Sequence, residues 1–418
     1  MLEVGQSVLG LVVLVLIAWG LSEARHKVRL SWIIIGVGLQ LILALVLLKI
    51  PGMFDLLSLL NRMALAIDEA TAAGTSMVFG YLGGGPLPFE QQPGQSTFIF
   101  AFRGLPIIIV MSALSALLFH WRVLPVLVQG LGRLLQRSMG VSGALGLGGA
   151  ANIFMGMLEA PLVIRPYLAR MNRSELFALM VCGMTTVAGT VMVLYATFLQ
   201  DRIPNALSHI LIASLISAPA AITVARIMVP ATEQETEPSV IMDSSSLYRS
   251  SIEAITEGVR SGLKLFLNIV AMLIVFVALV HLLNMMLSVL PLIDAAPITL
   301  ERVLGWLFAP VVWLLGVPWS EAVVAGSLMG IKTALNELLA YLHLAQLGPD
   351  QLSERSALIM TYALCGFANP GSLGVMLGGM GVLLPERHHE VMALGFKSVV
   401  AGTIGSCMTG AVVAIVMG

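Results

Sequence analysis

Two carboxylates stand in strongly apolar stretches of the chain. Glu159 lies in NIFMGMLEAPLVIRPYL (152–168), and Glu337 lies in TALNELLAYL (333–342). Within a bilayer a charged side chain costs at least about 2.5–3.5 kcal/mol on insertion scales, so such residues face a partner or a water-filled cavity. A carboxylate in that position accepts hydrogen bonds from a polar solute, binds a cation or carries a proton. Both glutamates are therefore candidates for binding a solute or an ion.

Proline residues near these stretches interrupt the helical pattern. Pro161 and Pro166 follow the first glutamate, and the segment ANPGSLG (368–374) interrupts a later apolar stretch. Proline exposes the backbone carbonyls of the preceding turn, and free carbonyls at broken helices bind ions and polar solutes. Asn369 precedes a proline, which displaces it from the helical region. We expect the side chains of Asn369 and Ser372 to line this break.

Other interpretations of the two glutamates remain open. They could form structural ion pairs with Arg165 and Lys332, or serve as acid and base in a membrane enzyme. The sequence argues against an enzyme because it has no nucleophile with an adjacent base, no ligand cluster and no phosphate loop. Cys182, Cys365 and Cys407 lie in apolar segments without a CxxC pair, so neither a disulfide frame nor a zinc site is expected. A structural protein or a channel is a third alternative, and both carboxylates count against it.

The composition places these residues in a membrane. Of 418 residues 58% are hydrophobic and only 11% are charged. A hydrocarbon core about 30 Å thick requires ~20 apolar residues per helix. The net charge of −1 gives no indication of a nucleic-acid partner, and none is expected. We predict an all-α integral membrane protein with about eight transmembrane helices, at 5–22, 31–50, 98–120, 176–199, 205–228, 265–290, 356–382 and 392–417.

Three further regions have a different pattern. The stretches 140–165 and 303–345 are rich in glycine or interrupted by proline, and each carries charge at its middle. This pattern predicts two re-entrant helical hairpins. Residues 53–73 have apolar positions at helical spacing with charged residues between them, in a segment too polar to span. They are expected to form a helix that lies in the membrane interface.

The distribution of basic residues predicts the topology. Positive charges follow the first apolar stretch, which indicates an uncleaved anchor with its N-terminus outside. Eight crossings from that start place 15 of the 22 basic residues on the cytoplasmic side. The prediction is a protein of the bacterial cytoplasmic (inner) membrane with both termini outside.

One unit of the sequence occurs twice. NRSELFALMVCGMTTVAGT (172–190) and ERSALIMTYALCGFANPGS (354–372) share an Arg-Ser start, an apolar helix and a Cys-Gly centre, each with an intramembrane glutamate upstream. Three spans separate the hairpins, so the copies enter from opposite faces. Inverted repeats with broken helices are typical of secondary transporters that bind substrate at the midplane. We divide the chain into N-terminal and interfacial helices, the third span with the first hairpin and repeat, a cytoplasmic loop with a scaffold helix, and the second hairpin and repeat, at 1–97, 98–228, 229–290 and 291–418.

Three motifs resemble the concentrative nucleoside transporter family. They are NIFMGMLEAPLVIRPYL, GVPWSEAVVAGSLMGIKTALNELLAYL and LCGFANPGSLGVMLGGMGVLLPERHHEVMALGFKSVVAGT, and the similarity covers roughly residues 95–415. The resemblance implies a homotrimer in which each protomer has a scaffold and a mobile transport domain built on two re-entrant hairpins. It implies import of nucleosides with a cation, which is sodium or, in some bacterial members, a proton.

The resemblance also implies roles for individual residues. Glu159 matches the glutamate that faces the nucleobase, and Glu337 matches the one that holds the ribose hydroxyls. Asn369 and Ser372 match the pair that binds ribose at the helix break. Carboxylates and carboxamides suit this role because they accept paired hydrogen bonds from vicinal hydroxyls.

A second set of residues matches the family's sodium site. Asn152 and Thr186 match positions near that site, and the carbonyls of Met155 and Val187 would contribute to it. Hard oxygen ligands suit a small cation. No other cofactor is expected.

The first hairpin departs from the family pattern. Gly-Gln-Thr-Glu or Gly-Gln-Ser-Glu is usual there, whereas this chain has Met157 and Leu158 before Glu159. Two hydrogen-bonding side chains have become apolar, and an apolar site discriminates less between base edges than a polar one. The second half keeps its ribose-binding residues, although Gly371 stands where the family usually has a hydroxyl. The prediction is cation-coupled import of nucleosides by alternating access, with another hydroxylated solute as the alternative.

Overall fold

The computed structural model describes residues 2–50, 52–90, 97–231, 248–292 and 297–418, and every regular element within these ranges is a helix. Backbone polar groups in a bilayer must bond internally, and a helix satisfies them within one segment. The predicted all-α membrane architecture is confirmed.

Six segments among the described residues are long and apolar enough to cross a membrane. The predicted spans at 5–22 and 356–382 are helical too, as α1 (Leu2–Gly20) and as the pair α17 (Glu354–Leu364) and α18 (Pro370–Leu383). The six are α2 (Leu30–Lys49), α4 with α5 (Phe100–Arg103 and Ile107–His120), α10 with α11 (Arg173–Thr185 and Gly189–Leu199), α12 (Ala206–Met228), α13 (Ser251–Leu287) and η3 with α19 (Pro385–Arg387 and His388–Met417).

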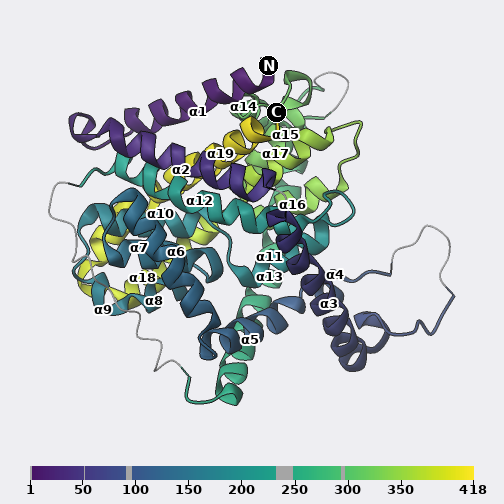
Figure 1. Cartoon of the computed structure of the whole chain (residues 1–418). Helices are drawn as coiled ribbons and strands as arrows, with labels where there is room; N and C mark the ends of the chain where they lie inside the picture. Colours follow the sequence, from purple (N-terminus) through teal and green to yellow (C-terminus); the bar gives the residue numbers. More distant parts are fainter. Residues whose placement is uncertain (1, 51, 91–96, 232–247, 293–296) are drawn as a thin grey trace.

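Amphipathic and short helices connect these segments. The prediction at 53–73 corresponds to the helix α3 (Met53–Phe79), which lies at one margin of the molecule in Figure 1. An amphipathic helix that the sequence reading did not predict, α6 (Val123–Met139), packs against the first hairpin and ends at Gly140, whose φ is +60°. The remaining short elements are η1 (Arg25–Lys27), η2 (Gly80–Gly83) and α9 (Arg165–Leu168).

The first predicted hairpin, at 140–165, consists of α7 (Gly143–Phe154) and α8 (Glu159–Val163). The second predicted hairpin, at 303–345, is longer than the structure supports, because this range contains three helices. The chain turns by 115° after the first of them, at Gly316, whose φ of +108° favours glycine. The hairpin that carries the second glutamate is therefore α15 (Trp319–Ala334) with α16 (Glu337–Gln346), and the preceding helix α14 (Leu300–Leu314) packs along α15.

Both copies of the repeat contain a broken helix. The break between α17 and α18 was expected from ANPGSLG, whereas the break between α10 and α11 was not, since 176–199 had been predicted as one continuous span. The two breaks lie side by side. Gly366 has a φ of +138°, and a Cβ atom there would lie 2.8 Å from the carbonyl oxygen of Thr185. Gly402 and Gly405 of α19 pack against Met184 and Thr185, which holds the first break against the last helix.

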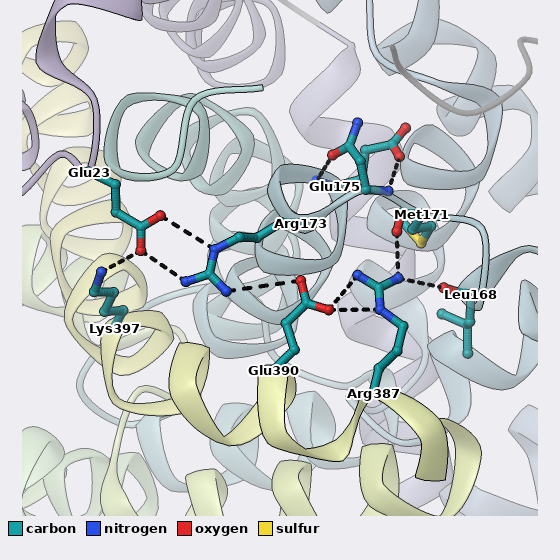
Figure 2. A network of polar contacts seen from close by, with 9 residues as sticks. Glu23, Leu168, Met171, Arg173, Glu175, Arg387, Glu390 and Lys397 are labelled. Atoms are coloured by element: carbon teal, nitrogen blue, oxygen red, sulfur yellow. Dashed lines mark hydrogen bonds and ion pairs between the residues drawn. The ribbon is translucent and has the colours of Figure 1, made fainter. Parts of the chain in front are cut away.

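Charged residues join distant parts of the chain at one face (Figure 2). Glu23, between α1 and α2, accepts hydrogen bonds from Arg173 of α10 (3.0 Å) and Lys397 of α19 (2.5 Å). Glu390 pairs with Arg387 at 2.7 Å and lies 4.0 Å from the Arg173 guanidinium. Burial alone raises the pKa of Glu23, but the hydrogen bonds and charges of Arg173 and Lys397 outweigh burial and leave this pKa below its usual value.

The two ends of the described chain lie together (Figure 1). A Cβ atom on Gly418 would lie 2.6 Å from the side chain of Val4, and α1 packs against α19. That both termini lie outside stays a prediction. Most of the predicted cytoplasmic loop at 231–251 lies outside the described residues.

Candidate substrate and cation sites

The Glu337 carboxylate is the centre of a buried polar cluster. It begins α16 directly after Asn336, whose side chain caps the helix by accepting from the Leu339 N–H at 2.9 Å. One carboxylate oxygen accepts from the Tyr195 hydroxyl at 2.7 Å, and the other accepts from the Asn369 amide at 2.9 Å. The three residues are at most 5% exposed. The carboxylate is thus fixed by two donors that come from different helices.

Asn369 forms the link between this cluster and the helix break. Its extended conformation, with ψ of 165°, follows from the proline after it, and it makes Asn369 the N-cap of α18. The side-chain oxygen accepts from the Ser372 N–H at 2.8 Å while the nitrogen donates to Glu337. Exposure rises at this point, since Pro370 is exposed and Ser372 is half-buried. The structure therefore brings Glu337, Asn369 and Ser372 together beside a break that opens to the surface.

The sequence reading missed Tyr195. This tyrosine of α11 is 2% exposed, and its ring packs on Tyr341 with centroids 4.9 Å apart. The Tyr341 hydroxyl donates instead to the Thr361 carbonyl at 2.8 Å, so only one of the two tyrosines bonds the carboxylate. A tyrosine within an apolar helix needs a partner for its hydroxyl, which is the one signal in the sequence that pointed to this role.

The side of the break that faces α13 is apolar. A Cβ atom on Gly371 would lie 3.3 Å from the end of Met272 and 3.7 Å from the ring of Phe276, both on α13. These two side chains, also absent from the predicted site, cover the N-terminus of α18. They form an apolar wall next to the polar cluster.

The tip of the first hairpin contacts the second repeat. The Leu158 side chain lies against Gly379 of α18, and Met157 lies against Gly183 of α10, where a Cβ atom would be 3.1 Å away. Glycine at both positions permits this close approach. The hairpin tip and the ribose-binding candidates thus share α18.

Glu159 begins α8 and is exposed in the protomer, with its carboxylate folded over Gly156. Its N–H donates to the Gly156 carbonyl at 3.1 Å. Among the described residues neither Glu159 with Arg165 nor Glu337 with Lys332 comes within the 4.0 Å of an ion pair. The alternative that these pairs are structural ion pairs therefore finds no support in the geometry.

The cation-site candidates surround the break in the first repeat. The Thr186 hydroxyl lies 2.9 Å from the Asn152 carbonyl and 2.8 Å from the Cys182 carbonyl. The Asn152 side-chain nitrogen donates to the Gly148 carbonyl at 3.0 Å, which turns its oxygen toward α10. The Val187 carbonyl accepts from Ser214 at 3.2 Å.

The donor set fits a small monovalent cation. Met155 is extended, with ψ of 159°, so its carbonyl leaves the helical direction at the end of α7. The set of hydroxyl, carboxamide and carbonyl oxygens contains hard ligands and no carboxylate. Nor do the described residues contain a group of three or more His, Cys, Asp or Glu side chains that would hold another metal.

A hollow of about 260 Å³ lies elsewhere, between α3 and the junction of α11 with α12. None of its lining residues belongs to the predicted site. They include Asn61, Thr197, Gln200, Asp201 and Asn205.

Two opposed hairpins, two broken helices and a buried carboxylate between them define a secondary transporter. Residues 9–82 and 209–414 match the sequence patterns of the N- and C-termini of Na⁺-dependent nucleoside transporters, and residues 101–202 match the pattern described as nucleoside recognition. The chain belongs to the Na⁺-dependent, concentrative nucleoside transporter family, and it is a transporter and not an enzyme.

Its relatives include bacterial and animal proteins. An uncharacterized transporter of Haemophilus influenzae is 37% identical, with 100% of this chain and 99% of the relative covered. The nucleoside permease NupC of Helicobacter pylori is 36% identical, with 99% and 97% covered. Human solute carrier family 28 member 3 is 32% identical, with 94% of this chain and 57% of the human protein covered.

Solved structures of one transporter match the whole fold. CNTnw in an inward-facing, substrate-bound state has a TM-score of 0.89 and 35% identity, with 100% of this chain and 98% of that chain covered. A doubly substituted form in an outward-facing state has a TM-score of 0.90 and 34% identity over the same shares.

Proposed function

We propose that this protein imports nucleosides together with a cation by alternating access. The observation that carries the proposal is the Glu337 carboxylate, held by the Tyr195 hydroxyl and the Asn369 amide at a helix break. The relative named nucleoside permease supports a nucleoside as the substrate.

In the proposal the second repeat binds the sugar. An ionised carboxylate has about four lone-pair positions, and two of them accept from protein donors here. The remaining positions suit the vicinal hydroxyls of ribose, with Asn369 and Ser372 beside them. Glu159 faces the base, together with the apolar side chains of Met157 and Leu158.

The proposed coupling ion is sodium, bound by Asn152, Thr186 and the carbonyls of Met155 and Val187. The oxygen-only donor set supports sodium over a transition metal. A proton carried by Glu159 or Glu337 is the second candidate, because both carboxylates lie in the part of the molecule that faces the substrate.

Movement of the hairpins supplies the access change in this proposal. CNTnw has been solved in inward-facing, intermediate and outward-facing states, and this chain shares its fold. We further propose a homotrimer in the bacterial cytoplasmic membrane with both termini outside. We also propose the division of the chain into four parts, at 1–97, 98–228, 229–290 and 291–418.

The test is uptake of labelled uridine into proteoliposomes, with sodium and pH gradients imposed separately. One monovalent cation entering down ~100 mV releases about 2.3 kcal/mol. A tenfold ion gradient adds about 1.4 kcal/mol, so accumulation of roughly several hundredfold is expected. Equal uridine inside and outside at steady state contradicts coupling, and undiminished pH-driven uptake in sodium-free buffer replaces sodium with a proton. Uptake of a labelled polyol in place of every nucleoside assigns the site to another hydroxylated solute.

A further inference from the structure

The first helices of the two hairpins carry different residues at the same position. Asn152 stands two residues before the end of α7, and Lys332 stands two residues before the end of α15. Each hairpin then turns and begins its second helix with a glutamate, Glu159 in α8 and Glu337 in α16. The repeat therefore places Lys332 where the first copy has a residue of the proposed cation site.

The partners of the two residues correspond as well. Asn152 meets the C-terminal end of α10 through its carbonyl, which lies 2.9 Å from the Thr186 hydroxyl. The Lys332 ammonium donates to the carbonyl of Ala363, near the C-terminal end of α17, at 3.0 Å. It also donates to the Ser406 hydroxyl of α19 at 2.5 Å. In each copy a hydroxyl and a carbonyl at the end of a broken helix lie beside the hairpin, although the second copy takes its hydroxyl from α19.

The burial of Lys332 distinguishes it from an ordinary lysine. Its exposure is 0%, and no carboxylate among the described residues lies within 4.0 Å of it. A buried charge without a paired carboxylate is unfavourable unless other groups solvate it. Carbonyl and hydroxyl oxygens do so here, and Glu337 lies near enough for electrostatic attraction. These are the ligands that a small inorganic cation would have.

We propose that Lys332 is a tethered cation, whose ammonium occupies in the second repeat the place that the coupling ion occupies in the first. The inference rests on the proposed cation site at Asn152. Each protomer then needs one exchangeable cation, because the second cation is part of the chain. Removing the side chain opens a second site for a small monovalent cation.

The experiment compares purified Lys332→Ala, Lys332→Met and wild-type protein in ammonium, methylammonium, sodium or tetramethylammonium chloride at equal ionic strength. The measurements are the Tm in detergent and the initial rate of uridine uptake into proteoliposomes. Lys332→Met is the matched control, since it fills the space without a charge.

In sodium chloride, which supplies the proposed coupling ion, we expect Lys332→Met to take up uridine at least about tenfold more slowly than wild type. Ammonium, methylammonium or sodium should raise the Tm of Lys332→Ala by several degrees, because a ligand that binds only the folded state stabilises it. Ammonium and methylammonium should leave the Tm of Lys332→Met unchanged. Sodium should raise the Tm of Lys332→Met less than that of Lys332→Ala, because Lys332→Met keeps only the first site. An equal response of both variants, or an equal effect of tetramethylammonium, overturns the proposal.

If Lys332→Ala does not fold in any salt, Lys332→Gln tests whether the charge of Lys332 is required. Glutamine keeps a donor for these oxygens but carries no charge, so its uptake should also fall at least about tenfold. Uptake close to wild type shows that a neutral donor suffices and overturns the proposal.

The assignment of the sodium site at Asn152 is tested by a separate measurement. Sodium should raise the Tm of the wild type. The variant Asn152→Ala, which keeps Lys332, should lack this rise. If that rise persists, the assignment of the first site is wrong, whereas the response of Lys332→Ala to ammonium is unaffected by this result.

Discussion

At the scale of single residues, the two glutamates occupy different environments. Glu337 is buried and both its oxygens accept from the protein, whereas Glu159 is exposed and its carboxylate lies over Gly156. A fixed carboxylate discriminates between substrates with and without a hydroxyl group. When the hydroxyl is missing, the remaining lone pairs of the carboxylate stay unpaired, which weakens binding. The sugar is therefore expected to be read more strictly than the base.

Sugar selectivity is the first prediction at this scale. Loss of a hydroxyl partner for a buried carboxylate costs ~1–3 kcal/mol, so 2′- or 3′-deoxynucleosides should compete at least about fivefold more weakly than ribonucleosides. Glu337→Gln should abolish this difference. Tyr195→Phe should reduce it, because the carboxylate loses one donor, while Tyr341→Phe should leave it intact since that hydroxyl bonds Thr361. The measurement is competition against labelled uridine, and full competition by deoxy sugars in the wild type contradicts the assignment.

Base selectivity is the second prediction. Met157→Gln combined with Leu158→Thr restores polar groups that can hydrogen-bond to base edges. The ratio between the strongest and the weakest competing base should therefore be at least about tenfold larger than in the wild type. Leu158→Met is the control, since it keeps an apolar contact with Gly379 and adds no polar group. A wild type that already separates the bases steeply would refute an apolar base site.

At the scale of helices, close backbone contact holds the two repeats together. Gly366 lies against the carbonyls of Met184 and Thr185, so the breaks in α10–α11 and α17–α18 meet without side chains between them. The helices on both sides supply the ends at which solute and cation are proposed to bind. A side chain at Gly366 would therefore displace both the proposed solute site and the proposed cation site.

Gly366→Ala is the third prediction. The φ of +138° is unfavourable for alanine, and its Cβ atom would lie 2.8 Å from the Thr185 oxygen. Strain and overpacking together should lower the free energy of unfolding by about 2 kcal/mol or more. Gly374→Ala is the matched control in α18, because nothing lies within 4 Å of its Cβ position, and it should be neutral or stabilising. The Tm of both proteins in detergent checks this, and equal values would show that the breaks tolerate a side chain.

At the scale of the whole molecule, the charged network of Figure 2 connects the N-terminal helices with the first repeat and the last helix. Glu23 is its shared acceptor. Arg173 and Lys397 approach it from helices more than 200 positions apart in the sequence. The network therefore stabilises an arrangement that no single segment specifies.

Stability in acid is the fourth prediction. The pKa of Glu23 is lower in the folded protein than its usual value near 4.5, so its stabilising contribution is present above that pH. The contribution is lost as the pH falls from 4.5 through the folded pKa. Glu23→Gln should lower the free energy of unfolding at pH 7 by about 1 kcal/mol or less, since the partners are partly exposed. Unfolding curves at pH 7 and below 4.5 check this, and a difference between the proteins that persists in acid would contradict it.

The sequence by itself determined what depends on neighbouring residues. Hydropathy showed the membrane class, proline after Asn369 showed the second break, and the repeated Cys-Gly segments showed the internal symmetry, because each is a local property of the chain. The break after Thr185 escaped detection because no proline marks it, whereas Pro370 marks the second break. Only the tertiary structure decided that Tyr195 bonds Glu337, 142 positions away, and that Lys332 bonds Ser406 and not a carboxylate. Such contacts depend on how helices pack through space, and one helix face offers many possible partners until that packing is fixed.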